Sequence, residues 1–200
     1  VYKTFISNED RTMTTGWKGV FPAVTTQFKE DLSVDIPETQ RVQDALVNDG
    51  VNGLIVMGTC GENNSLDPEE KRTILKAAVE VVNGRVPGVT GVSELDTRRA
   101  VAYARDAEKL GADGLMLLPA MVYVPKPEEL IAHFRAVAQA TSLPIMLYNN
   151  PPAYRVNIGA DVLQALADVP NIKAVKESAP DPRRFTDLIN AFGDRFDIFA

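Results

Sequence analysis

The stretch GLIVMGTCGENNSLDPEEKRTILKAAVEVV, residues 53–82, contains the repeating unit that decides the fold. It opens with a short apolar run and ends in a segment with apolar residues at helical spacing, Ile74, Leu75, Ala78, Val81 and Val82. Between them, Asp67-Pro68-Glu69-Glu70 offers a capping side chain, a proline with a preset φ and acids at the positive end of the helix dipole. The stretch predicts a buried strand, a loop and an amphipathic helix.

Apolar runs of this kind recur at a spacing of roughly thirty residues, the length of a strand-helix-strand unit. They are Val20 to Val24, Gly53 to Met57, Val89 to Val92, Gly114 to Leu118, Ile145 to Tyr148, Ile172 to Val175 and Phe196 to Phe199. A second helical pattern runs through residues 100–110, and Asp181-Pro182 repeats the helix-start signal. Near-continuous apolar strands that alternate with amphipathic helices imply parallel strands covered by helices. The sequence therefore predicts an α/β protein.

Two architectures fit this alternation, a closed eight-stranded barrel and an open doubly wound sheet. The open dinucleotide-binding version needs a Gly-rich turn after its first strand, whereas Val24 is followed by Thr25-Thr26-Gln27-Phe28. The (β/α)8 TIM barrel is therefore favoured. Such a barrel takes about 250 residues, and the seventh predicted strand has only begun at Ala200, so we expect a barrel domain over residues 13–200 that is C-terminally incomplete. Residues 1–12 are polar and patternless, and we expect a disordered or non-native extension before Met13.

Composition excludes several classes of function. A net charge of -6 and a pI near 4.9 give no basic surface for nucleic acid. No apolar stretch is long enough to cross a membrane, and no secretory signal is recognisable, so we expect a cytoplasmic protein. One cysteine, Cys60, and one histidine, His133, leave no disulfide, no zinc site and no histidine-based triad. We expect neither metal nor cofactor, and we interpret His133 as a helix-surface or subunit-contact residue.

Polar residues stand where the predicted strands end, which is where a barrel collects its chemistry. Lys176 follows Ile172-Lys173-Ala174-Val175, and a lysine that ends a buried strand is partly desolvated, which lowers its pKa and frees its amine to attack a ketone. The alternative is a lysine that reaches the rim or pairs with Glu177. Tyr148 also ends an apolar strand, where a phenol could exchange protons with a carbinolamine and an imine, or could be a core tyrosine with a satisfied hydroxyl.

The turn after the second predicted strand is rich in small residues. Gly58, Thr59, Cys60 and Gly61 offer backbone N–H groups and a threonine hydroxyl that could bind a carboxylate. A Gly-x-x-Gly turn can equally be a tight loop in which the glycines only supply unusual backbone angles.

The three motifs together are more specific than any one of them. Gly58-Thr59-Cys60-Gly61-Glu62, Leu147-Tyr148-Asn149-Asn150-Pro151 and Val175-Lys176-Glu177-Ser178, in this order and spacing, resemble the dihydrodipicolinate synthase and N-acetylneuraminate lyase family. The resemblance covers residues 16–200. It implies a pyruvate-type class I mechanism in which Lys176 forms a Schiff base, Tyr148 relays protons, and the turn at Thr59 and Cys60 holds the carboxylate of a 2-oxo acid. It also implies a barrel followed by C-terminal helices and a homotetramer built as a dimer of dimers.

Three departures from the family pattern bear on the substrate. Ala153 stands where dihydrodipicolinate synthases have a carboxylate-binding arginine, and Arg155, two positions later, could point the same way on a strand-like path but reach elsewhere. Pro119-Ala120-Met121 replaces Pro-Tyr-Tyr, whose second tyrosine completes a proton relay across the dimer, and Tyr123 is a possible substitute. Cys60 replaces a second threonine, and a thiol is the weaker hydrogen-bond donor.

The leading hypothesis is a Schiff-base lyase that acts on a small 2-oxo acid or its cyclic imine by aldol cleavage or condensation, dehydration or deamination. Its proposed catalytic residues are Lys176, Tyr148 and Thr59. The proposed substrate-binding residues are Thr59, Cys60, Gly58, Arg155 and Tyr123. Dihydrodipicolinate synthase itself and a hydroxy-pyrroline-carboxylate deaminase of hydroxyproline breakdown are alternatives within the family. A catalytically silent, metabolite-binding barrel is the alternative from a different class.

Overall fold

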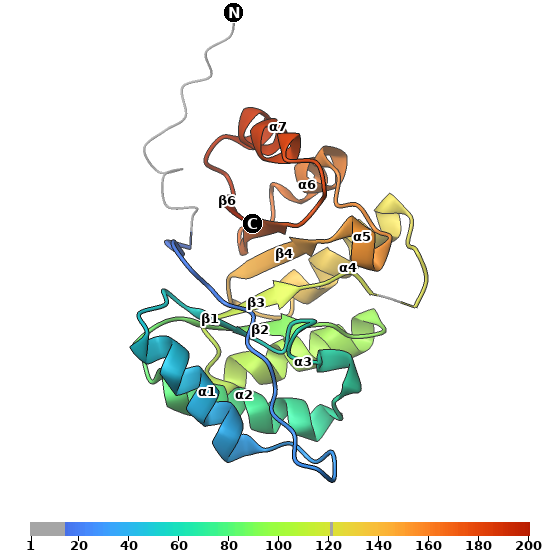
Figure 1. Ribbon diagram of the computed structural model, residues 1–200. Helices are drawn as coiled ribbons and strands as arrows, with labels where there is room; N and C mark the ends of the chain where they lie inside the picture. Colours follow the sequence, from blue (N-terminus) through green and yellow to red (C-terminus); the bar gives the residue numbers. More distant parts are fainter. Residues whose placement is uncertain (1–14, 121) are drawn as a thin grey trace, which may run out of the picture.

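The computed structural model describes residues 15–120 and 122–200, and it consists of one curled parallel sheet with helices on its outer side (Figure 1). The proposed extension and Met13 lie outside the described residues, as does Met121. The six strands are hydrogen-bonded in chain order: β1 Leu54–Val56, β2 Gly88–Val92, β3 Gly114–Leu117, β4 Ile145–Asn149, β5 Ile172–Glu177 and β6 Asp197–Phe199. Every pairing between neighbours is parallel. The sheet is part of a (β/α)8 barrel, as the sequence predicts.

Helices precede or connect these strands. They are α1 Ile36–Asn48, α2 Pro68–Val82, α3 Thr97–Leu110, α4 Pro127–Ala138, α5 Pro151–Tyr154, α6 Ala160–Leu166 and α7 Arg183–Phe192, with a short 3-10 turn, η2, at Asn63–Ser65. In Figure 1, α1, α2 and α3 cover the outer side of β1 to β3. Within the described residues, no helix is both long and apolar enough to cross a bilayer.

The apolar side chains form two separate clusters because neighbouring residues of a strand point to opposite faces of the sheet. The larger cluster lies between the sheet and the helices and includes Leu54, Leu115, Phe134 and Val175. The smaller cluster lies on the inner face of the curl. It consists of Trp17, Ile55, Val89, Met116, Leu118, Met146, Tyr148 and Ala174. The inner cluster therefore identifies which positions of each strand face the inside of the barrel.

The predicted first strand, Val20 to Val24, is the one run that does not form a regular strand. It lies beside β1 and makes a single parallel bridge, between Ala23 and Ile55. Pro22 has no N–H to donate, and Met57 turns away from the ladder with a φ of 52°. These two residues limit the pairing to one bridge, although the chain still runs along the edge where the prediction places it.

Both predicted helix-start signals lie at the start of a helix, although α7 begins one residue later than its signal predicts. At α2, the carboxylate of Glu70 accepts a hydrogen bond from the backbone N–H of Asp67 at 2.8 Å. At α7, Pro182 is the residue before the helix, and Asp181 accepts from the backbone N–H of Arg183 at 3.0 Å. Both starts are satisfied by a carboxylate, as expected from their sequences.

Gly91 in β2 allows the end of β1 to turn inward. A Cβ at Gly91 would lie 2.0 Å from the carbonyl oxygen of Met57, which therefore occupies the space of the missing side chain. The positive φ of Met57 directs its carbonyl there. The turn that follows Met57 thus depends on a glycine in the neighbouring strand.

We expect Gly91→Ala to destabilise the protein by about 1 to 3 kcal/mol, because overpacking against backbone cannot relax through a rotamer change. Gly88→Ala is the matched control in the same strand, since the nearest atoms to its Cβ would be side-chain atoms, of Val82 at 3.4 Å and Asp113 at 3.8 Å. Urea unfolding of both variants measures the difference. Equal stability of the two variants would contradict this account of the Met57 turn.

Candidate active site

Lys176 and Tyr148 lie side by side at the ends of two paired strands. The register of β4 and β5 pairs Tyr148 with Lys176. Lys176 lies two residues after Ala174, a member of the inner cluster, and so faces the same side. Its Nζ atom lies 4.2 Å from the centroid of the Tyr148 ring. The amine is therefore half-buried on the inside of the curl and next to the phenol, rather than directed into bulk solvent.

The Tyr148 phenol is held by the segment that follows it. The side chain of Asn150 donates to the Tyr148 hydroxyl at 3.1 Å. The same side chain caps α5 by accepting from the backbone N–H of Ala153, and Pro151 occupies the first turn of the helix. Because α5 has one turn, Tyr154 returns to Tyr148, and their rings meet edge to face with centroids 5.6 Å apart.

Thr59 lies at the same place, in the turn after β1. Its hydroxyl is hydrogen-bonded to the hydroxyl of Tyr154, and either oxygen can be the donor. Tyr154 is thus a member of the site that the sequence analysis missed. The signal that could have identified it is the Asn150-Pro151-Pro152 helix start, which turns the chain back so that an aromatic residue four positions after Asn150 faces Tyr148.

The turn from Gly58 to Glu62 offers fewer free amides than the sequence suggests. The amide of Gly61 donates to the Gly58 carbonyl at 3.0 Å, and that of Glu62 donates to the Thr59 carbonyl at 3.1 Å. Within residues 15–120 and 122–200, the amides of Thr59 and Cys60 have no hydrogen-bond acceptor. Both residues are exposed, whereas Gly58 is buried. A carboxylate at this turn could therefore accept from two amides and the threonine hydroxyl.

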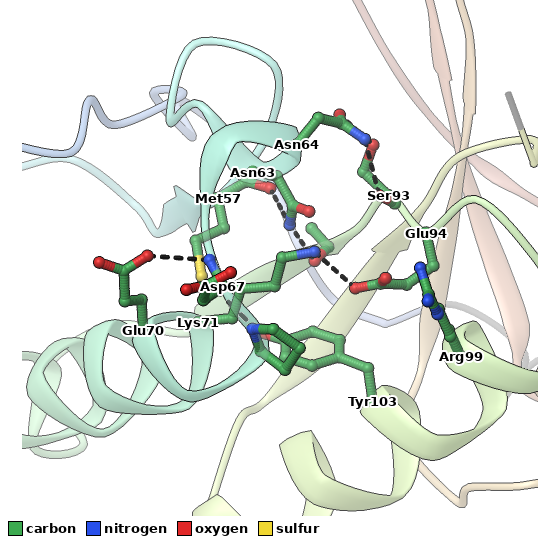
Figure 2. A network of polar contacts seen from close by, with 12 residues as sticks. Met57, Asn63, Asn64, Asp67, Glu70, Lys71, Ser93, Glu94, Arg99 and Tyr103 are labelled. Carbon is green, nitrogen blue, oxygen red and sulfur yellow. Dashed lines mark hydrogen bonds and ion pairs between the residues drawn. The ribbon is translucent and has the colours of Figure 1, made fainter.

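A buried polar network holds this turn from behind (Figure 2). The Asn63 side chain donates to the carbonyls of Met57 at 2.9 Å and Gly91 at 3.1 Å, so it joins the ends of β1 and β2. Nearby, Lys71 of α2 forms a 2.7 Å ion pair with Glu94, and their side chains are only 7% and 13% exposed. The network fixes the backbone that carries Thr59.

Glu177 is held on the opposite face of β5 from Lys176. Its buried carboxylate accepts from the Asn149 side chain at 2.9 and 3.0 Å and forms a 2.8 Å ion pair with Arg184. The alternative in which Lys176 pairs with Glu177 is therefore wrong, because alternation along a strand sends the two side chains to opposite faces. Asn149 also accepts from the backbone N–H of Ile158 at 2.8 Å, which ties the chain beyond α5 to the sheet.

We expect Arg184→Met to destabilise the protein by about 3 to 5 kcal/mol, because it leaves the Glu177 carboxylate buried without its cation. The side chain of Glu177 is 0% exposed, so its carboxylate is desolvated and depends on its protein partners. Arg183→Met is the control, since Arg183 is 84% exposed and its surface pair with Asp181 should contribute about 1 kcal/mol or less. Chemical denaturation that finds equal losses in both variants would rule out this role for Arg184.

Arg155 and Tyr123 lie apart from these contacts. The strand-like path proposed for Arg155 is wrong, because residues 151–154 form α5 and Arg155 ends it in the left-handed region with a φ of 57°. Its side chain is exposed. Tyr123 is 63% exposed in the loop before α4, and its hydroxyl lies 3.5 Å from a Glu129 carboxylate oxygen. Cys60 is a free, exposed thiol.

The expectation that His133 lies on a helix surface is also wrong. The residue is 5% exposed and shares the buried face of α4 with Leu130, Phe134 and Val137. Its Nδ1 atom is 2.9 Å from the hydroxyl of Thr97, at the start of α3. Burial lowers the pKa of His133, although the Leu118 carbonyl and Asp96 act in the opposite direction.

We expect the free energy of unfolding to decrease as the pH falls below 6.5, the ordinary pKa of histidine. The folded-state pKa of His133 is the lower one, so the unfolded chain binds the proton first, and the full stability is present only above pH 6.5. His133 is the single histidine, so His133→Asn should flatten the change between pH 7.5 and pH 5.5 in urea unfolding. An unchanged slope in the variant would show that other groups cause it.

Known proteins resemble this chain over nearly its whole length. The family model described as the dihydrodipicolinate synthetase family matches residues 16–200. A 4-hydroxy-tetrahydrodipicolinate synthase from Desulforamulus reducens is 38% identical over 182 residues, which cover 90% of this chain and 62% of that protein. An uncharacterized DapA-like lyase from Rhizobium meliloti is 37% identical over 186 residues, which cover 93% of this chain and 62% of that protein.

Solved structures give the same result. The chloride-inhibited dihydrodipicolinate synthase from Acinetobacter baumannii, complexed with pyruvate, matches with a TM-score of 0.88 and 31% identity over 91% of this chain and 62% of that chain. The chain spans about three fifths of the length of the curated relatives it matches, at 62% of the Desulforamulus reducens protein and 64% of a protein from Desulforudis audaxviator.

Proposed function

Because this chain belongs to the dihydrodipicolinate synthetase family, we propose that it carries the Schiff-base site of a class I lyase that acts on pyruvate or a related small 2-oxo acid. The observation that carries the proposal is the Lys176 amine, half-buried on the inner face and 4.2 Å from the centre of the Tyr148 ring. The pyruvate complex of the Acinetobacter baumannii relative supports the choice of substrate class. The expected homotetramer and cytoplasmic location belong to the same proposal.

Each inner side chain has a role in the proposed reaction. The neutral amine of Lys176 attacks the C2 carbonyl of the 2-oxo acid, and a proton moves from nitrogen to oxygen to give a carbinolamine. The Tyr148 hydroxyl then donates a proton to the departing hydroxyl, which leaves as water while the nitrogen lone pair forms the iminium. The iminium accepts the electron pair of a bond that breaks at C3 or C4.

The turn after β1 is the proposed carboxylate site. The amides of Thr59 and Cys60 and the Thr59 hydroxyl could donate to the substrate carboxylate, and buried Gly58 lets the substrate approach the backbone. Arg155 and Tyr123, both exposed on loops at the carboxyl ends of the strands, are proposed to contact more distant parts of a substrate.

Synthesis of 4-hydroxy-tetrahydrodipicolinate is the second candidate, favoured by the names of several curated relatives. Ala153, exposed at the third position of α5, argues against it, because a methyl group cannot bind the carboxylate of a second substrate.

The proposed imine is tested by borohydride reduction of the full-length protein with pyruvate, followed by peptide mass mapping. We expect a pyruvyl adduct on Lys176 and none in Lys176→Arg, because a guanidinium does not form an imine. Lys173→Arg is the matched control three residues earlier in β5, at a lysine whose pKa is lowered by burial. A folded wild-type protein that binds pyruvate without an adduct would support the catalytically silent barrel.

A further inference from the structure

Three hydroxyl groups of this chain come together beside Lys176. Tyr148 ends β4, Tyr154 ends α5 and Thr59 lies in the turn after β1. The hydroxyl of Tyr154 is hydrogen-bonded to that of Thr59, and the Tyr154 ring packs against Tyr148 at an interplanar angle of 85°. Tyr154 therefore lies between the phenol beside the lysine and the exposed threonine, with a ring contact to the first and a hydrogen bond to the second.

The surroundings of Tyr154 favour a neutral hydroxyl. Burial raises the pKa of Tyr154 to about 12, the hydrogen bond with Thr59 acts against this rise, and the neighbouring Tyr148 adds to it. A phenol with this pKa stays protonated at neutral pH. It can pass a proton only by donating one while it accepts another, which requires a hydroxyl partner on each side.

Asn150 limits which groups can exchange a proton with the Tyr148 hydroxyl. Its Nδ2 donates to the Tyr148 oxygen at 3.1 Å and so occupies one acceptor site of that oxygen. The Tyr148 hydrogen remains available for the substrate side. A proton that Tyr148 gives away must then be replaced from a neighbour other than the Asn150 amide, and Tyr154 is the adjacent hydroxyl-bearing ring.

We infer that Tyr154 is a positioning residue for proton transfer, and that Tyr148, Tyr154 and Thr59 form a relay within a single chain. The inference rests on the proposed Schiff-base function. In this relay Tyr154 takes the part of the second tyrosine of the family pattern, for which Tyr123 was the substitute suggested by the sequence. Because Thr59 is exposed, it is the end of the relay that meets solvent.

The proton balance of one step is as follows. When the carbinolamine oxygen leaves as water, it takes the hydroxyl proton of Tyr148. Tyr148 recovers a proton from Tyr154, Tyr154 recovers one from Thr59, and Thr59 recovers one from water. The net change is one solvent proton consumed, one water released and one iminium formed, and the three hydroxyls are restored.

The test uses the full-length protein and pyruvate in D2O, where exchange of the C3 protons is followed by NMR and the Lys176 adduct by borohydride trapping. We expect Tyr154→Phe to reduce the exchange rate by about 10- to 100-fold, within the range for proton-transfer groups, and to leave the equilibrium yield of adduct unchanged. Tyr103→Phe is the control, since it removes a phenol hydroxyl that is bonded to Thr90 at 2.8 Å and lies 3.8 Å from the Met57 sulfur, on the helix side of the sheet rather than beside Lys176.

Two further variants separate a relay from a structural role. Thr59→Val should reduce exchange and Thr59→Ser should restore it, because serine keeps the hydroxyl. Replacing Tyr154 by 3-fluorotyrosine, whose phenol is more acidic, should keep exchange fast and move its alkaline limb to lower pH. These two results decide the question even where Tyr154→Phe fails to fold.

The outcomes distinguish the two proposals. Absence of any adduct in the folded wild-type protein overturns the Schiff-base function. A normal adduct with wild-type exchange in Tyr154→Phe, or an unmoved alkaline limb in the fluorotyrosine protein, overturns the relay and leaves the Schiff-base function intact.

Discussion

The register between β4 and β5 is the constraint on which the site depends. It pairs Tyr148 with Lys176 and Asn149 with Glu177. Because side chains alternate, the first pair faces inward and carries the proposed chemistry, whereas the second pair faces outward and is fully hydrogen-bonded. A slip of the β4–β5 register by one residue would exchange these faces and place the Glu177 carboxylate against the apolar inner cluster. The Asn149, Glu177 and Arg184 contacts therefore oppose a slip, and they hold the lysine next to the phenol.

The second constraint on the site is the turn after β1, where the backbone bends into the space that a side chain at Gly91 would occupy. Gly91 lets the Met57 carbonyl enter the inner layer, and Asn63 donates to both carbonyls at that point. Buried backbone acceptors need such a donor, since an unpaired polar group costs free energy. The turn that carries Thr59 is thus fixed from its outer side. Its inner side keeps the amides of Thr59 and Cys60 without an acceptor in the described part of the chain.

The sequence predicts the architecture well because the relevant signals are local. Apolar runs and helical spacing identify β1 to β6, α2 and α3, and the strand-end rule brings Lys176, Tyr148 and Thr59 to one end. The errors come from contacts that spacing does not reveal. The loss of pairing at Val20 to Val24 depends on the φ of Met57, and the burial of His133 depends on how α4 meets α3. The strand-like path predicted for Arg155 is wrong because the residues before it form a one-turn helix.

The one-turn helix α5 brings Tyr154 to the site, and Tyr154 lies outside the family motifs quoted above. Four residues are too few for a helix to be stable by itself, so α5 is held by Asn150 at its start and by the Asn149 contact to Ile158 beyond its end. One segment of seven residues, Tyr148 to Tyr154, supplies both phenols and the amide that orients the first of them. A hydroxyl relay built this way needs only the additional threonine of the β1 turn. Its geometry is then set by local hydrogen bonds and by the packing of two rings.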